Sequence, residues 1–268
     1  MKKIHDAPRV IALDIETAPM EVYAWRCGKQ VVTIDHIKTG TSILSYSWCE
    51  WRHGKKVKAR FDSTFSQADQ RNDKLLLERL HAILSTATHV IAHNGIRFDL
   101  PMIRWRMHEQ GLPQLPPIRV IDTMWLSKHI GTPESRKLAW LTRHQSTSKS
   151  SHGKFPGMEL WKAYLDRNPQ AEREMRIYNN RDVESMCELL DSVLPYARGQ
   201  MIAGLVPQSI GREEETPVCP KCGGDVSPRG FYMTTAGRYQ RYRCNDCGGW
   251  SRSRLLVREK RKHLLSPV

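Results

Sequence analysis

The sequence lacks any apolar run that approaches the roughly 18 to 20 residues needed to span a membrane. Its first residues, Met1 to Asp6, lead directly into a strand-like segment, without the apolar region of a secretory signal. The first absence argues against a helix that spans a membrane. Together the two absences predict a soluble, intracellular, cytoplasmic protein with no membrane partner.

Acidic residues are scarce: 28 Asp and Glu stand against 42 Lys and Arg, which gives a formal net charge of +14. This excess of base favours a polyanionic partner, and nucleic acid fits better than an anionic membrane surface. Hydrophobic residues make up 40% of the chain and charged residues 26%, so a packed core can form and wholesale disorder is excluded.

Cysteine is also sparse, with seven residues, and its only pattern is a pair of Cys-x-x-Cys motifs near the C-terminus. The other three, Cys27, Cys49 and Cys187, are scattered. An odd total combined with metal-like spacing argues against a disulfide scaffold and for a reducing compartment.

The chain up to about residue 200 alternates segments with strand-like and helix-like patterns. Such alternation predicts an α/β fold, in which helices cover a sheet. We predict strands at 9–17, 42–51, 56–62, 89–93 and 118–122, the second and third joined as a hairpin, and helices at 67–86, between Gly95 and Gln110, and at 171–196.

The composition changes after the segment from Pro207 to Pro217, which carries three consecutive Glu residues. Beyond this segment the chain is rich in Cys, Gly, Arg and Tyr. We therefore predict a first domain over 1–206, a linker over 207–217, and a small second domain over 218–268 that ends in a basic tail.

Acidic residues occur at two places in the predicted sheet: the end of the first strand and the passage from the strand at 89–93 to the following helix. Asp14 and Glu16 are two positions apart on the first strand, so their carboxylates share a face and need either solvent or a divalent cation. Asp99 precedes Pro101, which is tolerated in the first turn of a helix. Asp99 is therefore either a helix cap or part of the sheet edge where α/β proteins bind ligands.

Another acidic residue lies within the long helix predicted at 171–196. Tyr178 and Asp182 are one turn apart, so the phenol and the carboxylate share a face of the helix. Met175 and neighbouring apolar residues lie on that face, which is therefore predicted to point inward. Solvation does not explain an Asp in such a position.

The motifs LDIET, HNxxxFD and YxxxD, in this order and at these separations, resemble the DEDD superfamily of proofreading-type 3′–5′ exonucleases. The Tyr of the third motif places the resemblance in the DEDDy branch, with the exonuclease domains of family B polymerases and ribonuclease D-like enzymes. The resemblance covers about residues 7–200. It implies a ribonuclease H-like mixed sheet flanked by helices.

The resemblance also implies roles for the acidic quartet. Asp14, Glu16 and Asp182 would hold one Mg²⁺ or Mn²⁺ ion, Asp14 would bridge to a second ion, and Asp99 would support the second. Two such ions stabilise the attacking and leaving oxygens of an in-line phosphoryl displacement. Tyr178 would orient the attacking water.

Residues beside the quartet have less specific signals. Thr17 is expected to offer its backbone to the substrate 3′-OH, and Asn94 either contacts the terminal nucleotide or forms a turn. His93 is expected to be packed rather than catalytic. Tyr23 and Trp25 are expected to pack in the core rather than stack on a base. Val120-Ile121-Asp122-Thr123 also resembles a superfamily segment, and Asp122 is predicted to be structural because the quartet is complete without it.

The C-terminal cysteines match a four-Cys zinc ribbon. Cys219 and Cys222 are separated by 21 residues from Cys244 and Cys247, and two glycines follow each pair. The matched pairs disfavour a redox role. The segment is too short to build its own core, so one structural Zn²⁺ ion would supply its folding energy.

Cations alternate with aromatic residues between and beside the two cysteine pairs. This pattern favours a strand surface that contacts phosphates and stacks on bases. A protein partner, or a minimal ribbon core with solvated charges, would also explain it. The predicted nucleic-acid contacts are Arg229, Tyr232, Arg238, Tyr239, Arg241, Tyr242, Arg243 and Trp250.

The sequence therefore predicts a two-metal-ion 3′–5′ exonuclease with a zinc ribbon that helps to hold the substrate. The resemblance favours DNA with a single-stranded 3′ end. An exoribonuclease, a structure-selective endonuclease and a catalytically silent nucleic-acid-binding adaptor are the alternatives. The intact acidic quartet argues against the adaptor.

Overall fold

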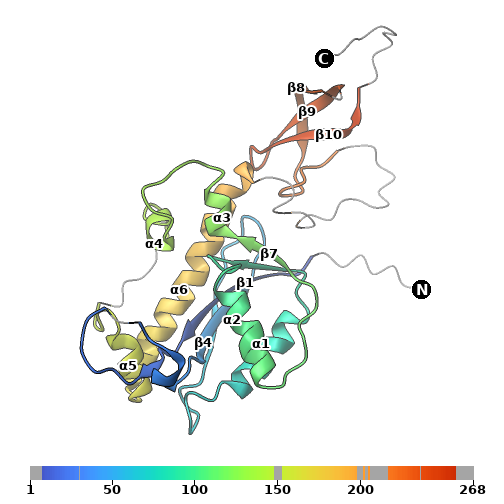
Figure 1. The fold of residues 1–268 in the computed structure, drawn as a ribbon. Helices are drawn as coiled ribbons and strands as arrows, with labels where there is room; N and C mark the ends of the chain where they lie inside the picture. The colour runs from blue at the N-terminus through green and yellow to red at the C-terminus, as the bar shows by residue number, and fades with distance from the viewer. Residues whose placement is uncertain are drawn as a thin grey trace. The chain divides into compact units, whose positions relative to one another are not determined.

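The computed structural model describes residues 8–29, 31–147, 153–197, 202, 205, 217–235 and 237–257. The chain divides into two compact units, one over Arg9–Leu190 and the other containing the residues from Asp191 onward (Figure 1). The predicted linker, apart from Pro217, and the basic tail from residue 258 lie outside the described residues. No helix among the described residues is both long and apolar enough to cross a membrane.

A five-stranded mixed sheet forms the centre of the first unit. Its strands are β1 (Val10–Thr17), β4 (Ile43–Glu50), β5 (Arg60–Ser63), β6 (His89–Ala92) and β7 (Arg119–Asp122), in the order β5-β4-β1-β6-β7. β4 runs antiparallel to β1 and β5, whereas β6 runs parallel to β1 and β7. The prediction of a helix-covered α/β sheet is confirmed. The β4–β5 hairpin also forms, but β5 begins at Arg60 rather than residue 56, because exposed lysines fill a longer loop.

Helices α1 (Lys74–Leu84) and α2 (Asp99–Glu109) cover one face of this sheet. Apolar residues of both helices pack with the β1 side chains Ile11, Leu13 and Ile15 in one buried cluster. α1 begins seven residues later than predicted. The carboxylate of Asp73, just before α1, accepts hydrogen bonds from the Ile43 backbone N–H at 2.9 Å and from Arg106 Nε at 2.8 Å.

The long helix α6 (Pro169–Val193) lies along the opposite face (Figure 1). The β4 hydroxyls Ser45 and Ser47 donate to the α6 amides Asn179 and Asn180 at 3.4 and 2.8 Å. Leu160 and Tyr164 of α5 (Glu159–Leu165) pack beside the start of α6. The shorter elements are α3 (Thr123–Ser127), α4 (Leu138–Leu141) and the 3₁₀ helix η2 (Leu194–Tyr196).

The chain leaving β1 forms a surface segment with the short strands β2 (Glu21–Val22) and β3 (Ile37–Thr39) and the 3₁₀ helix η1 (Ile34–His36). The expectation that Tyr23 and Trp25 pack in the core is wrong: their side chains are 66% and 97% exposed. The two-stranded β2–β3 pairing is too small to cover them.

The second unit contains a three-stranded antiparallel sheet in the order β10-β9-β8. Its strands are β8 (Val226–Thr234), β9 (Gly237–Cys244) and β10 (Trp250–Leu256). Within 217–235 and 237–257, Cys219, Lys221, Cys244 and Gly249 are buried, and no large apolar side chain is. Hydrophobic burial therefore contributes little to the stability of this sheet.

Candidate active site and cysteine centre

The end of β1 directs its two carboxylates toward α6. Asn179 Nδ2 donates to Asp14 Oδ2 at 2.6 Å and to the Asp14 carbonyl at 3.3 Å, which ties the strand to the helix. A register shift between Glu16 and Thr17 interrupts the pairing of β1 with β4. Bulges of this kind re-aim side chains and occur frequently beside active sites.

Glu16 and Tyr178 are brought together by Trp161, a residue of α5. The Trp161 indole N–H donates to Glu16 Oε2 at 3.1 Å. The Trp161 and Tyr178 rings meet edge to face, with centroids 6.4 Å apart and planes at 81°. The predicted acid and the predicted phenol therefore contact the same indole from two elements that are far apart in the sequence.

Asp99 is the first residue of α2, and its side chain turns toward β1. Asp99 Oδ1 accepts a hydrogen bond from the Ile15 backbone N–H at 3.3 Å, so the carboxylate lies beside the strand that carries Asp14 and Glu16. Phe98 occupies the N-cap position of α2, and its side chain makes no capping hydrogen bond. Burial, with a smaller contribution from the negative charge of Asp122, raises the pKa of Asp99 to about 7.

Asp182 lies on α6 three residues after Asn179, and its side chain is 3% exposed. The inward face predicted for this Asp agrees with that burial. Carboxylate oxygens are the ligands that Mg²⁺ and Mn²⁺ prefer, and a cation would return the buried Asp99 to its charged form. Among the described residues, the cysteines discussed below form a group of three or more potential ligands close enough to hold a metal ion, and the four carboxylates do not form such a group. The donor set nevertheless suits hard divalent ions.

The loop after β6 is held in place by hydrogen bonds to neighbouring side chains and backbone. The Asp122 carboxylate accepts four backbone hydrogen bonds of 3.0–3.3 Å, two from this loop (Asn94 and Ile96) and two from the first turn of α3. This arrangement agrees with the structural role predicted for Asp122. Both ring nitrogens of His93 also contact protein oxygens, Thr123 Oγ1 at 2.8 Å and the Arg136 carbonyl at 2.9 Å. His93 is thus packed, as expected.

Asn94 adopts a left-handed φ of 65°, which fits its predicted turn role. The next residue must be small, because a Cβ on Gly95 would come within 2.2 Å of Ala92 Cβ. Thr17 is half-buried at the register shift of β1. The contacts of Asn94 and Thr17 with substrate stay predictions.

Sequence reasoning missed Asn179 and Trp161. Asn179 had a usable signal, because it lies three residues before Asp182 on the same predicted inward face. Trp161 had none, since 145 residues separate it from Glu16 and no periodicity connects them.

The burial of the Asp99 carboxylate can be tested by measuring the free energy of unfolding against pH in the absence of metal ions. Because burial raises the pKa of Asp99 from its ordinary value of 3.8 to about 7, the folded chain retains a proton that the unfolded chain releases between these pH values. Stability contributed by this group is therefore present at acid pH and is lost as pH rises to about 7. In EDTA, the free energy of unfolding of the wild type should therefore fall between pH 4 and pH 8. Asp99→Asn is expected to remove up to about 4 kcal/mol of this fall.

Urea unfolding of both proteins across this range measures the difference. Asp166→Asn, at an exposed carboxylate just after α5, controls for the loss of a charge. Parallel pH profiles for wild type and Asp99→Asn would contradict the prediction.

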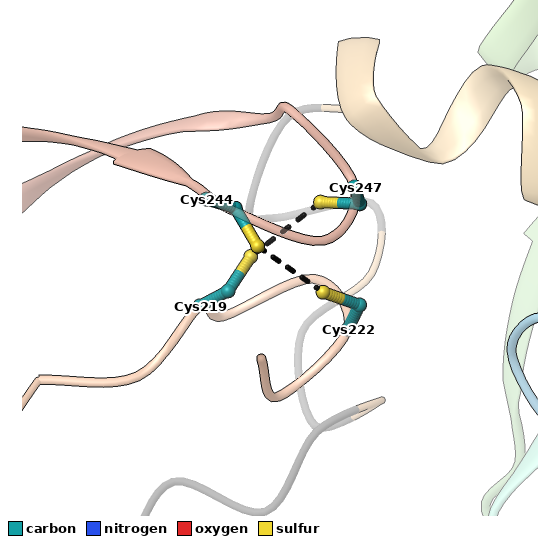
Figure 2. A group of neighbouring side chains, drawn as sticks. All are labelled: Cys219, Cys222, Cys244 and Cys247. Atoms are coloured by element: carbon teal, nitrogen blue, oxygen red, sulfur yellow. Dashed lines mark hydrogen bonds between the residues drawn. The ribbon is translucent and has the colours of Figure 1, made fainter. Parts of the chain in front are cut away.

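The four C-terminal cysteines form a compact group. Their sulfurs point toward one another from the turn before β8 and from the end of β9 with the turn after it (Figure 2). All four ligand atoms lie within 4.8 Å of one another, with Sγ–Sγ distances of 3.8 Å for Cys219–Cys247 and 3.5 Å for Cys222–Cys244. A tetrahedral ion with metal–sulfur bonds of about 2.3 Å separates its sulfurs by about 3.8 Å. The group therefore fits zinc.

Each cysteine pair lies in the same kind of backbone turn. Gly223 and Gly248, which follow the second cysteine of each pair, have φ values of 80° and 70° that favour glycine. Burial raises the pKa of the Cys247 thiol to about 11 and raises that of Cys222 as well. Burial opposes the charged form of Cys244 too, but backbone N–H groups of Cys247 and Asp246 lower its pKa overall. A bound cation would stabilise all four as thiolates.

Strand pairing sorts the predicted nucleic-acid contacts onto two faces of the small sheet. β9 pairs Tyr239 with Tyr232 of β8, and Arg243 with Trp250 of β10. Because side chains alternate along a strand, Arg238 and Tyr242 lie on the other face. Arg229 lies at a register shift of β8, where pairing assigns no face. The first face carries Tyr232, Tyr239, Arg241, Arg243, Trp250 and Arg252.

Arginines stack on the aromatic rings of this first face. The Arg252 guanidinium lies 4.1 Å from the ring centroid of Tyr239 and 5.5 Å from that of Tyr232. Arg241 lies 4.8 Å from that of Trp250. The three strands contain six arginines and no acidic residue. This face thus presents ordered cations and aromatic rings with no acid on its strands.

A family model described as the RNase H superfamily matches residues 38–194. A search of curated proteins finds no match. Among similar solved structures is a family B DNA polymerase from the hyperthermophilic archaeon Pyrobaculum calidifontis, at 12% identity and a TM-score of 0.48, covering 87% of this chain and 34% of the polymerase chain. The chain spans about a third of that polymerase.

Proposed function

Because the chain belongs to the RNase H superfamily, we propose that it is a metal-dependent nuclease that hydrolyses DNA from single-stranded 3′ ends. The observation that supports this most is the set of carboxylates at the end of β1. Asp14 and Glu16 come from the strand itself, Asp99 turns onto that strand from α2, and Asn179 ties the strand to the helix that carries Asp182. The three motifs on these elements resemble DEDDy exonucleases.

Two Mg²⁺ or Mn²⁺ ions are the cofactors of this proposal. Asp14, Glu16 and Asp182 would hold one ion, and Asp14 and Asp99 the other. When bound, such a pair supplies charge stabilisation to the attacking and leaving oxygens of an in-line displacement at phosphorus.

The protein's own residues prepare the site. Asn179 fixes the Asp14 carboxylate through its 2.6 Å hydrogen bond, and Trp161 fixes Glu16. The edge contact with Trp161 also holds the Tyr178 ring beside Glu16, where its hydroxyl would orient the attacking water. Thr17 and Asn94 are proposed to contact the 3′-terminal nucleotide.

Other activities of the same fold make different predictions. An exoribonuclease would use the same carboxylates on RNA, and a structure-selective endonuclease would cut internally. A silent adaptor would bind without cleavage. The complete acidic quartet supports an enzyme, and the motif resemblance favours the DNA exonuclease.

Digestion of end-labelled substrates tests this proposal. Single-stranded DNA and RNA of matched sequence, labelled at the 5′ end, would be incubated with Mg²⁺, with Mn²⁺ or with EDTA. We expect a metal-dependent ladder that shortens from the 3′ end of DNA. A ladder from RNA alone would indicate the exoribonuclease, and a single internal cut the endonuclease. Retained binding without cleavage of either polymer would contradict nuclease function.

Trp161 should act as a positioning residue. Trp161→Phe keeps an aromatic ring beside Tyr178 but removes the N–H that donates to Glu16. Loss of such a partner of a metal-binding carboxylate typically costs 10–100-fold, so we expect a loss of about that size in activity or an equal rise in the Mg²⁺ requirement. Cleavage rates measured against Mg²⁺ concentration would show it. Trp105→Phe, at a 59% exposed residue of α2, is the matched control.

The three-stranded sheet is proposed to hold nucleic acid through its arginine–aromatic face. This arrangement suits phosphates and stacked bases. Binding of a protein partner is the competing role for this unit, and the four-Cys group is proposed to hold one Zn²⁺ ion in either case.

Salt dependence distinguishes these roles. Each phosphate contact on a single strand contributes about 0.7 to the slope of log affinity against log salt. Arg241→Ala with Arg252→Ala should therefore reduce the slope by about 1.4, as measured by anisotropy of labelled DNA. Lys74→Ala with Arg104→Ala, at exposed residues of α1 and α2, removes the same charge and should leave the slope unchanged. An unaltered slope in the first double variant would favour a protein partner.

A further inference from the structure

A second cationic site lies where the β4–β5 hairpin meets the start of β1. A hollow of about 340 Å³ opens there, and most of its lining is polar. Six of its lining residues are cations: Arg9, Arg52, Lys55, Lys56, Lys58 and Arg60.

The hollow has one acidic lining residue, Glu50, and this carboxylate already contacts two of the cations. Glu50 lies 3.8 Å from Arg9 Nε and 3.6 Å from an Arg52 guanidinium nitrogen. Six positive charges against one negative charge leave a local excess of five. Like charges that converge on a hollow repel one another, and a polyanion would relieve that repulsion.

The loop that carries these cations is anchored at both ends. Trp51 is buried, and its backbone N–H donates to the Val10 carbonyl at 2.9 Å. Ala59 is also buried, and its N–H donates to Glu184 Oε1 on α6 at 3.0 Å. Gly54 makes the turn between these anchors with a φ of 68°. The backbone on either side of the exposed lysines is therefore held in place.

An aromatic platform completes the site. The Arg60 guanidinium lies 5.1 Å from the ring centroid of Trp48, across the β4–β5 pair. Stacking of this kind fixes the plane of a guanidinium while its N–H groups remain available to phosphate oxygens. The lysines beside it add point charges with freer geometry.

The hollow is remote from the carboxylates of the proposed active site. Arg9 precedes β1, whereas Glu16 lies near its other end, seven residues along an extended strand. At about 3.3 Å per residue this separation is about 23 Å. Trp48 and Arg60 lie on the sheet face of Ile11 and Leu13, whereas Asp14 and Glu16 lie on the other face, so a strand that reaches both sites must pass around the edge of the sheet. Because stacked nucleotides advance about 3.4 Å each, this path covers at least about seven nucleotides.

We propose that this hollow binds the phosphodiester backbone of the substrate strand at least about seven nucleotides from the bond that is cleaved. The proposal rests on the proposed nuclease function and adds a length requirement to it. Strands long enough to reach the hollow are held by both sites, whereas shorter strands are held by the active site alone. The part of any length preference that the hollow contributes is thus a property of the first unit.

A charge-reversal variant tests the proposal. Lys56→Glu with Lys58→Glu changes two exposed residues of the hollow, and Lys74→Glu with Arg104→Glu makes the same charge change on α1 and α2. KM and kcat would be measured on a 4-nucleotide and a 30-nucleotide single-stranded DNA. We expect the hollow variant to raise KM at least about tenfold for the 30-mer, leave the 4-mer unchanged, and reduce the salt slope of 30-mer binding by about 1.4 or more.

Equal effects of the two double variants, or equal effects of the hollow variant on both substrates, would overturn the proposal. So would an unchanged salt slope, which would assign the hollow to an acidic protein partner. If wild type cleaves neither substrate, the nuclease function fails, while anisotropy with the 30-mer still tests the hollow. If the charge-reversal variant does not fold, Lys56→Ala with Lys58→Ala takes its place. The unfolding midpoint of this second variant would show that it is folded.

Discussion

Asp14→Asn is expected to reduce the rate of DNA hydrolysis by at least about 10³-fold, with affinity for single-stranded DNA changed less than about threefold. Asp14 is the carboxylate proposed to contact both ions, and it is held by Asn179 at 2.6 Å. Metal ions contribute several kcal/mol of charge stabilisation to the transition state, and about 4 kcal/mol corresponds to 10³ in rate. The net basic charge and the arginine-rich sheet, which would bind the DNA, are unaltered.

Single-turnover cleavage and anisotropy on the same preparation separate these two quantities. Asp182→Asn should reproduce the loss from the opposite side of the site. Asp166→Asn, at an exposed residue just after α5, is the charge-matched control and should behave as wild type. Retention of more than a tenth of the wild-type rate by Asp14→Asn would remove this residue from the catalytic machinery.

Much of this site could be predicted because its elements are local. The period of two places Asp14 and Glu16 on one face of β1, and the period of 3.6 places Asp182 on the inward face of α6. Pro101 places Asp99 at the start of α2. The predicted fold class, a ribonuclease H-like α/β domain with a small C-terminal zinc-ribbon unit, is confirmed by the family match and the four-Cys group.

The remaining features depend on contacts between distant segments. The Trp161–Glu16 hydrogen bond spans 145 residues, and no local pattern specifies it. The exposure of Trp25 depends on the absence of a covering element in the described structure around β2 and β3, whereas hydrophobicity alone suggests burial. The division of ribbon residues into two faces requires the strand register, including the shift between Pro228 and Phe231.

Cys222→Ser is expected to abolish zinc binding and to unfold the three-stranded sheet. The Sγ–Sγ distances of 3.5 and 3.8 Å fit a tetrahedral ion, and no large apolar side chain is buried within the described residues from 217 to 257. A structural zinc site contributes about 10–16 kcal/mol at pH 7, which no apolar core in this unit replaces. We expect zinc content to fall from one to zero per chain and amide protection in β8–β10 to disappear.

Cys27→Ser distinguishes this effect from the loss of any cysteine, because Cys27 is exposed and outside the four-Cys group. Zinc analysis and hydrogen exchange on both variants make the comparison, and Cys27→Ser should keep its zinc and its exchange protection. The first unit has its own apolar core around β1, α1 and α2, so its unfolding midpoint should be the same in both proteins. A protected β8–β10 sheet in zinc-free Cys222→Ser would mean that strand pairing alone stabilises this unit, and the metal would then have no structural role.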